Sequence, residues 1–248
     1  MKKHIITFLI VSTFAGAFAQ NDRRHAIYIL DAGLTLDTYC DSEMSIPEGC
    51  ECPDINSTYN EFSGFSTAVE VNTAGAPYLV YINHALFSNN VTSIKINDYE
   101  YATVTRCYFD MQSAPTFASN FYGLYLNNCN AYTVEENHFH RPSLSRKNYM
   151  GVRVNNSGTA ATTIYRNIFD EMNYGIYVSG TNSGLQMLCN DFNNGDKDIY
   201  IADSHTSVSL LQGNQQTSAG NTFDGTVSAN INNNSSHYIG YYYTENPN

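Results

Sequence analysis

The chain lacks tryptophan altogether, and only 14% of its 248 residues are charged. Basic residues are especially few: 12 Lys and Arg stand against 23 Asp and Glu, which gives a formal net charge of −11 at pH 7. Nucleic acids and anionic membranes attract positively charged surfaces, so this composition makes both unfavourable partners. We therefore expect no nucleic-acid partner. The polar surface is supplied instead by Asn, Ser, Thr and the 20 tyrosines.

Long apolar runs are absent except at the N-terminus, so the sequence predicts no membrane span. There, Lys2 and Lys3 precede the run IITFLIVSTFAGAFA, which is too short for a span and ends in the Ala-Phe-Ala pattern of a signal-peptidase site. We interpret residues 1–19 as a signal peptide, cleaved near Ala19-Gln20, and expect a secreted or cell-surface protein. Loss of the two lysines would leave ten basic residues against 23 acidic ones, a net charge of −13.

Familiar motifs of catalysis and metal binding are also missing. The sequence contains no P-loop, HExxH or EF-hand pattern and no Ser/His/Asp order of a hydrolase. Its seven histidines are scattered, and the pair His138 and His140, which flanks one phenylalanine, gives no metal site by itself. We therefore predict neither a metal nor a cofactor.

What the chain does contain is a sequence repeat of variable length, here called a phrase, that recurs every 22 to 30 residues and ends in a phenylalanine. The phenylalanines that define the register are Phe87, Phe109, Phe139, Phe169 and Phe192. An apolar residue stands five positions before each of them: Ile82, Val104, Val134, Ile164 and Met187. Short alternating segments with paired apolar residues lie between the phrases: Val69/Val71, Ile94/Ile96, Leu124/Leu126, Val152/Val154, Ile176/Val178 and Ile199/Ile201.

Alternation over three to five residues predicts strands, and no segment shows the 3.6-residue period of a helix. Short strands in a constant register favour a solenoid in which each turn of the chain, a coil, stacks on the previous one. The Leu-x-x-Leu-x-Leu framework of a leucine-rich repeat is absent, and an immunoglobulin-like sandwich would show no constant register. We predict an all-β, right-handed parallel β-helix of about six to seven coils. The Phe residues and the apolar residues five before them should form two buried columns.

Two polar registers precede each phenylalanine. The position two before it is Asn137, Asn167 and Asn190 in the last three phrases, and stacked amides can donate to and accept from one another, so we predict an asparagine ladder. The position three before it reads His84, Arg106, Glu136, Arg166 and Cys189. Arg106, Glu136 and Arg166 on successive coils predict a structural salt bridge.

The six cysteines divide into two groups. Cys40, Cys50 and Cys52 precede the repeats and favour one disulfide, between Cys40 and either Cys50 or Cys52. Zinc binding by this group is the alternative, but no fourth ligand has suitable spacing. The second group, Cys107, Cys129 and Cys189, lies inside the repeats at different registers. Cys107 and Cys189 would lie three coils apart, about 14 Å at the spacing of strands in a sheet. That separation exceeds the disulfide limit of about 7 Å between Cα atoms, so we predict two free thiols.

The segments GIYVSGTNSGLQMLCNDFNN (175–194) and AGNTFDGT…YIGYYY (219–243) resemble right-handed parallel β-helix proteins of the pectate-lyase-like superfamily. The specific resemblance is to repeat-rich secreted proteins of the Bacteroidota. It covers roughly residues 65–243 and implies the fold, whereas the same repeat serves enzymes, adhesins and spacers. We interpret residues 20–64 as an N-terminal cap or irregular segment. Residues 244–248 are interpreted as the tail of a fragment or of a short relative.

Ligand sites can be sought along outward columns, in which neighbouring residues lie about 4.8 Å apart. The first outward column reads Glu70, Lys95, Tyr125, Arg153, Tyr177 and Tyr200, and the second reads Asn72, Asn97, Asn127, Asn155 and Ser179. A pectate-lyase-like or polygalacturonase-like site needs adjacent carboxylates, which neither column supplies, so we predict no catalytic residue. Tyr125, Arg153, Tyr177 and Tyr200 are instead candidates for stacking on sugar rings. The alternative is a purely structural cation–π ladder centred on Arg153.

Loop length marks a second candidate region. The connection from the phenylalanine to the next strand takes seven residues in three coils, but 15 after Phe109 and 13 after Phe139. Loops 110–122 and 140–150 should therefore leave the same edge on neighbouring coils, where binding residues often lie, although tolerated insertions remain the alternative. The second loop carries three candidate ligand-binding bases: Arg141, Arg146 and Lys147.

These observations predict a non-catalytic β-helix repeat module for adhesion or glycan binding, with an anionic polysaccharide or cell-surface glycan as partner. The alternative is a polysaccharide lyase or glycoside hydrolase that acts on an acidic polysaccharide. A structural spacer is the second alternative. An enzyme would shorten the polysaccharide, a binder would retard it without changing its length, and a spacer would do neither.

Overall fold

The computed structural model contains strands and turns but no helix within the residues that it describes. These residues are 24–37, 60–73, 78–111, 118–141, 148–224 and 230–243. The interpretations of residues 1–19 and 244–248, and of the cysteines Cys40, Cys50 and Cys52, fall outside them. In the described part of the chain, no helix is long and apolar enough to cross a membrane.

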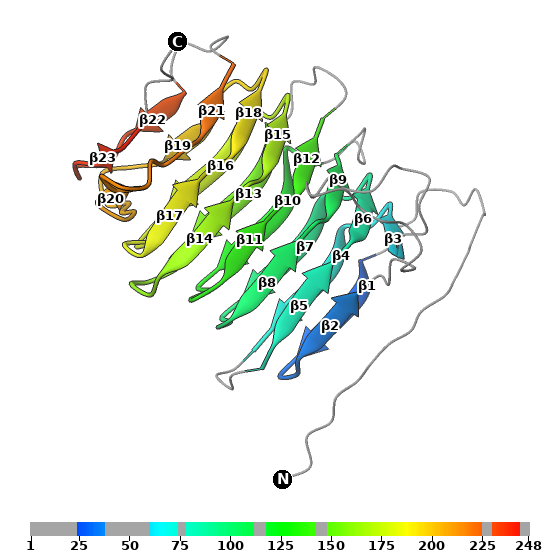
Figure 1. Ribbon diagram of the computed structural model, residues 1–248. Coiled ribbons are helices and arrows are strands. Elements are labelled where there is room, and N and C mark those ends of the chain that lie inside the picture. The colour runs from blue at the N-terminus through cyan, green and yellow to red at the C-terminus, as the bar shows by residue number, and fades with distance from the viewer. Residues whose placement is uncertain are drawn as a thin grey trace, which may run out of the picture.

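The strands form three parallel sheets that the chain visits in turn (Figure 1). The first sheet has eight strands, in the order β1 (His25–Leu30), β4 (Thr67–Asn72), β7 (Thr92–Asn97), β10 (Asn120–Asn127), β13 (Asn148–Asn155), β16 (Tyr174–Ser179), β19 (Ile199–Ile201) and β22 (Ile231–Asn233). The second has six, β2 (Leu34–Asp37), β5 (Val80–Asn83), β8 (Ala102–Thr105), β11 (Thr133–Glu135), β14 (Thr162–Tyr165) and β17 (Leu185–Leu188). The third has seven, β3 (Asn60–Ser63), β6 (Ala85–Ser88), β9 (Tyr108–Asp110), β12 (His138–His140), β15 (Ile168–Asp170), β18 (Asp191–Asn193) and β21 (Thr222–Phe223).

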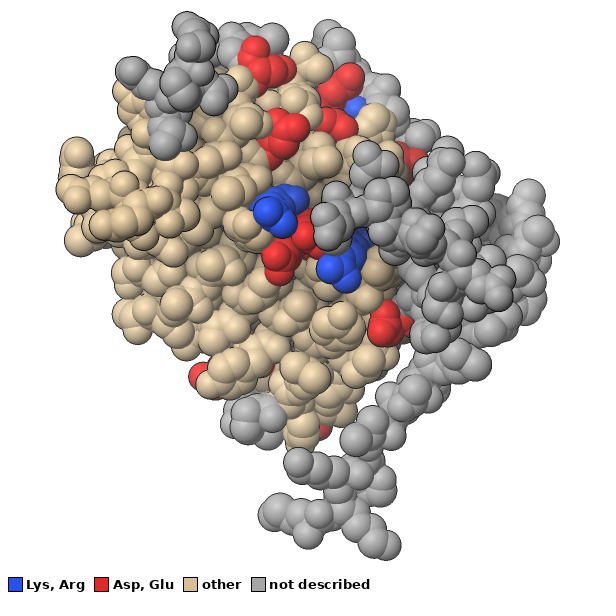
Figure 2. Space-filling model, viewed as in Figure 1, with Lys and Arg blue, Asp and Glu red and all other residues tan. Residues whose placement is uncertain are grey.

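This topology is a three-sided parallel β-helix, which confirms the predicted fold class. From β1 to β19, nearly every strand pairs in parallel with the strand three places later in the chain, as β10 does with β13 and β13 with β16. Figure 1 shows the result as a stack whose colour runs from blue to red along its length. Near the C-terminus, β20 (Leu211–Gln212) and β23 (Gly240–Tyr241) form a separate two-stranded sheet. Charged side chains are sparse on the face shown in Figure 2, in keeping with the composition.

The stack begins before the expected boundary at residue 65. β1 pairs with β4, and Phe62 of β3 stacks on Phe87 of β6 with ring centroids 5.2 Å apart. The repeat is difficult to recognise here in the sequence because residues 38–59 separate β2 from β3 and lengthen the period. The first sheet therefore contains more strands than the six to seven coils expected.

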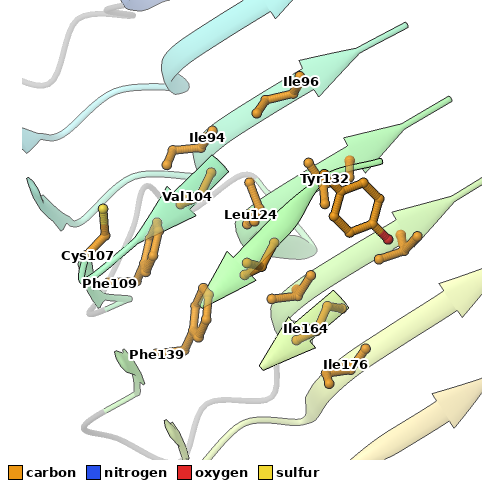
Figure 3. Close-up of a cluster of buried hydrophobic side chains, with 14 of the residues drawn as sticks. Ile94, Ile96, Val104, Cys107, Phe109, Leu124, Tyr132, Phe139, Ile164 and Ile176 are labelled. Carbon is orange, nitrogen blue, oxygen red and sulfur yellow. The ribbon is translucent and has the colours of Figure 1, made fainter. Parts of the chain in front are cut away.

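The core consists of stacked inward columns, as predicted (Figure 3). The rings of Phe62, Phe87, Phe109, Phe139, Phe169, Phe192 and Phe223 stack successively, with centroids 4.5 to 5.4 Å apart and interplanar angles of 5° to 16°. The second column, five positions earlier, is at most 2% exposed: Ile82, Val104, Val134, Ile164 and Met187. Because one coil cannot cover its own inward side chains, burial depends on the coil above and the coil below.

The predicted asparagine ladder lies inside the helix. The amide nitrogens Nδ2 of Asn137, Asn167 and Asn190 each donate to the Oδ1 of the next asparagine in the stack, over 2.9 to 3.0 Å, and Asn221 receives the last bond. The Oδ1 atoms of Asn137, Asn167 and Asn190 also accept the backbone N–H groups of the residues at the same register on the preceding coil, which are Cys107, Asn137 and Asn167. The ladder thus satisfies backbone groups that the turn leaves out of the sheets.

The residue before each ladder position has a left-handed backbone. Its φ angle is between 50° and 56° at His84, Arg106, Glu136, Arg166 and Cys189, although none of them is glycine. This conformation is uncommon for such residues, and here it turns the chain between the second and third sheets. The expected salt bridge forms: Glu136 Oε2 lies 2.9 Å from Arg106 Nε, and Glu136 Oε1 lies 3.8 Å from Arg166 Nη1. Cys107 and Cys189 are free thiols, as predicted.

One buried carboxyl group interrupts this apolar pattern. Asp198 directly precedes β19, is 2% exposed, and its Oδ2 has no hydrogen-bond partner among the described residues. Burial and, secondarily, the charge of Asp224 raise the pKa of Asp198 to about 6. The folded protein therefore holds this proton more tightly than the unfolded chain does.

The Asp198→Asn variant should be more stable than the native protein at pH 8 by roughly 2 to 3 kcal/mol, since about two pKa units correspond to that free energy. Because the pKa of Asp198 is raised in the folded state, the native protein has its full free energy of unfolding below about pH 4, where this carboxyl group is protonated. That contribution to stability is lost as the pH rises through about 6. At pH 4 the two proteins should therefore unfold alike. Urea unfolding between pH 4 and 8 measures the difference, with the exposed Glu100→Gln as control. An identical pH profile for Asp198→Asn and the native protein would contradict the prediction.

Candidate functional site

The outward face of the first sheet carries the predicted column in register. The strand pairings place Glu70, Lys95, Tyr125, Arg153, Tyr177 and Tyr200 beside one another in that order. At the N-terminal end of this column the charges are paired. Glu70 lies 2.9 Å from Lys95 Nζ and 2.7 Å from His25 Nε2. Burial raises the pKa of Glu70, but hydrogen bonds from Lys95 and His25 outweigh it, so that the pKa lies below its ordinary value.

Arg153 occupies the centre of the column among three tyrosine rings. Its guanidinium carbon lies 4.8 Å from the ring centroid of Tyr125 and 5.5 Å from those of Tyr122 and Tyr177. Its Nη1 donates to the Tyr122 hydroxyl over 3.0 Å. The cation is therefore held by aromatic faces and one hydroxyl, as the structural alternative for Arg153 expects.

A second cation extends the cluster toward β19. Lys197 Nζ lies 4.6 Å from the Tyr200 centroid and 4.9 Å from that of Tyr174. The rings of Tyr174, Tyr177 and Tyr200 contact one another with centroids 5.2 to 5.4 Å apart. Burial raises the pKa of Tyr177, although the nearby Arg153 charge lowers it, so its hydroxyl stays protonated well above neutral pH. We call this set the tyrosine–cation surface: Tyr122, Tyr125, Arg153, Tyr174, Tyr177, Lys197 and Tyr200.

The two cations of this surface differ from other cations of the protein in their contacts. Within the described residues, neither Arg153 nor Lys197 forms an ion pair with a carboxylate, in contrast to Lys95 and Arg106. All seven side chains of the surface are partly exposed. An acidic protein thus presents a local positive charge that is embedded in aromatic rings on the outward face of the first sheet.

Three members of the surface were not expected from the sequence: Tyr122, Tyr174 and Lys197. Each stands three positions before a residue of the predicted column, and strict alternation puts residues three apart on opposite faces. The alternation breaks because Gly123 and Leu124 are both buried, as are Gly175 and Ile176. A glycine before the apolar pair marks this break after Tyr122 and Tyr174, whereas the buried Asp198 takes that place after Lys197.

The basic loop residues are placed differently from the column. The loops leave the same edge, since Asp110 and His140 are neighbours at the ends of β9 and β12. Arg141, however, is only 2% exposed: its Nη1 donates to Asn173 Oδ1 over 3.0 Å, and its guanidinium lies over the Tyr149 ring. Arg146 and Lys147 lie outside the described residues.

Comparison with known proteins adds no relative. Searches of family models, curated proteins and solved structures find no match to this chain.

Proposed function

We propose that the protein is a secreted or cell-surface β-helix module that binds an anionic glycan, without cleaving it, on the tyrosine–cation surface. The observation that supports this proposal most directly is a pair of cations, Arg153 and Lys197, that have no carboxylate partner among the described residues and are set among five tyrosines. Tyrosine rings pack against the apolar faces of sugars, and their hydroxyls hydrogen-bond to sugar hydroxyls. The cations would attract the carboxylate or sulfate groups of the glycan.

The rigidity of the sheet favours this use. The column residues sit on strands that are hydrogen-bonded on both sides, from β10 to β19, so the rings keep a fixed spacing. A ligand that binds preformed rings loses less free energy to ordering the protein. The charges of Glu70, Lys95 and His25 are already paired, and the proposed surface therefore begins at Tyr122 and Tyr125.

Polygalacturonate and its methyl-esterified form are suitable probes, because they share a backbone and differ in charge. We expect the full chain to bind the acidic form more tightly, and added salt to weaken this binding. Tyr200→Ala and Lys197→Gln should each reduce the affinity about tenfold, equivalent to about 1.4 kcal/mol. Isothermal titration calorimetry measures the affinity. Gel filtration of the polysaccharide should show unchanged length, which separates binding from the lyase or hydrolase alternative.

The control for these variants lies on the second sheet. Tyr165 also packs against an arginine, with Arg166 5.1 Å from its ring centroid, but lies outside the tyrosine–cation surface. Tyr165→Ala should therefore bind as the native protein does. Equal losses in Tyr165→Ala and Tyr200→Ala would refute the assignment of the surface. Absence of binding to acidic sugars of either the carboxylated or the sulfated class would favour the spacer.

A further inference from the structure

The third sheet carries two histidines and an aspartate on its outward face. His138 and His140 flank the inward Phe139 in β12, and Asp170 is the Cα partner of His140 in the neighbouring strand β15. The sequence separates Asp170 from the histidines by 30 residues or more, so only the stacking of the strands brings the three together. This face is distinct from the first sheet, which carries the tyrosine–cation surface.

The potential ligand atoms of these residues converge. His138 Nε2 lies 2.5 Å from Asp170 Oδ2, and His140 Nδ1 lies 4.0 Å from the same oxygen. One atom from each residue lies within 4.8 Å of the other two. In a tetrahedral zinc site with metal–ligand distances of about 2.0 to 2.2 Å, ligand atoms are about 3.3 Å apart. The observed separations bracket this value, so small side-chain rotations would suffice to admit the ion.

Neighbouring side chains orient the cluster. Asn193 in β18 donates its Nδ2 to the other carboxylate oxygen of Asp170, Oδ1, over 2.9 Å. This bond leaves Oδ2 directed toward the histidines. The Tyr108 ring packs edge-on against His138, with centroids 4.9 Å apart, and limits its movement. Such outer contacts hold metal ligands in position in known sites.

We propose that His138, His140 and Asp170 bind a divalent transition-metal ion, with Zn²⁺ the best match. Two imidazole nitrogens and one carboxylate oxygen suit zinc, whereas calcium and magnesium require oxygen ligands. Water completes the coordination. The bound ion cross-links β12 and β15 from outside the helix, and therefore stabilises the folded chain in proportion to its occupancy. The simpler alternative is that the His138–Asp170 hydrogen bond is the whole interaction.

The test uses the full chain after removal of metals with a chelator. Zn²⁺ titrated by calorimetry should bind with one equivalent at this site, and thermal unfolding should shift to a higher temperature with Zn²⁺. Co²⁺ should bind in its place and give the visible absorption bands of a tetrahedral site with nitrogen and oxygen ligands. Because the chain has six cysteines, the near-ultraviolet absorption of cobalt–thiolate bonds must also be recorded. Those bands would indicate a different site.

Variants assign the ligands. His140→Gln and Asp170→Asn should each lower the Zn²⁺ affinity by about 100-fold or more, and Asn193→Ala, which changes a positioning residue, by about 10-fold to 100-fold. His205→Gln is the matched control, since His205 lies 4.0 Å from Asp203 but, among the described residues, no third potential metal ligand converges on this pair. Its affinity should equal that of the native protein. Thermal unfolding in chelator checks that each variant folds.

Two outcomes would overturn the proposal. One is a native protein that shows neither stoichiometric Zn²⁺ binding nor a cobalt spectrum. The other is a His138→Gln/His140→Gln double variant that keeps the native spectrum and affinity. Because the native spectrum is decisive by itself, the test holds even where a variant fails to fold. Glycan binding on the first sheet can succeed or fail independently of either result.

Discussion

Asn167→Ala should lower the free energy of unfolding by about 3 to 5 kcal/mol, because it leaves several buried polar groups without partners. Asn167 is fully buried, and its Oδ1 accepts both the backbone N–H and the Nδ2 of Asn137. Its Nδ2 donates to Val134 O and to Asn190 Oδ1, each over 3.0 Å. Alanine supplies none of these groups, and the site is closed to bulk water. Urea unfolding at constant pH measures the loss.

The control is the same substitution in a second asparagine ladder, which is partly exposed to water. Asn155 donates to Asn127 Oδ1 over 2.8 Å and accepts from the Ser179 hydroxyl, but it lies on the outward face of the first sheet. Water can replace these bonds, so Asn155→Ala should cost no more than about 1 kcal/mol. If both variants lose the same stability, burial of the ladder is not the reason for its strength.

Gly151→Ala should destabilise the protein by about 2 to 4 kcal/mol through overpacking. A Cβ atom at this position would lie 2.6 Å from Cδ1 of Phe169 and 2.8 Å from the carbonyl oxygen of Gly175. The phenylalanine stacks tightly between its neighbours in the column and cannot move aside, and the carbonyl belongs to the adjacent strand. Thermal or urea unfolding measures the effect.

A double-mutant cycle identifies the clash. Phe169→Leu removes ring atoms nearest the added methyl group, so the loss in Gly151→Ala/Phe169→Leu should be smaller than the sum of the single losses by about 1 kcal/mol. The clash with Gly175 remains, which limits the rescue. Ser93→Ala is the control, because Ser93 already has a Cβ at the corresponding place in β7 and should change stability by less than about 1 kcal/mol. Additive losses in the cycle would show that Phe169 is not the obstacle.

The candidate site was only partly predictable. Tyr125, Arg153, Tyr177 and Tyr200 follow from the register, since one residue per coil at a fixed position must form a column. Tyr122, Tyr174 and Lys197 did not follow, because two successive buried residues break the alternation and turn residues three apart to the same side. Arg141 was expected on an exposed loop, yet it packs on Tyr149 and Asn173 inside the edge of the helix.

The sequence by itself determined the columns of this protein. The same registers recur because each coil packs against the coils above and below it in the same way. The Phe stack, the aliphatic column and the asparagine ladder can therefore be recognised by aligning the chain with itself. Only the tertiary structure decided which side chains of different columns contact one another. The left-handed turns at Arg106 and Glu136 carry no glycine signal, and the approach of Asp170 to His138 depends on how adjacent coils stack. Repetition constrains contacts along a column, whereas contacts between columns depend on the angles of turns that local sequence specifies weakly.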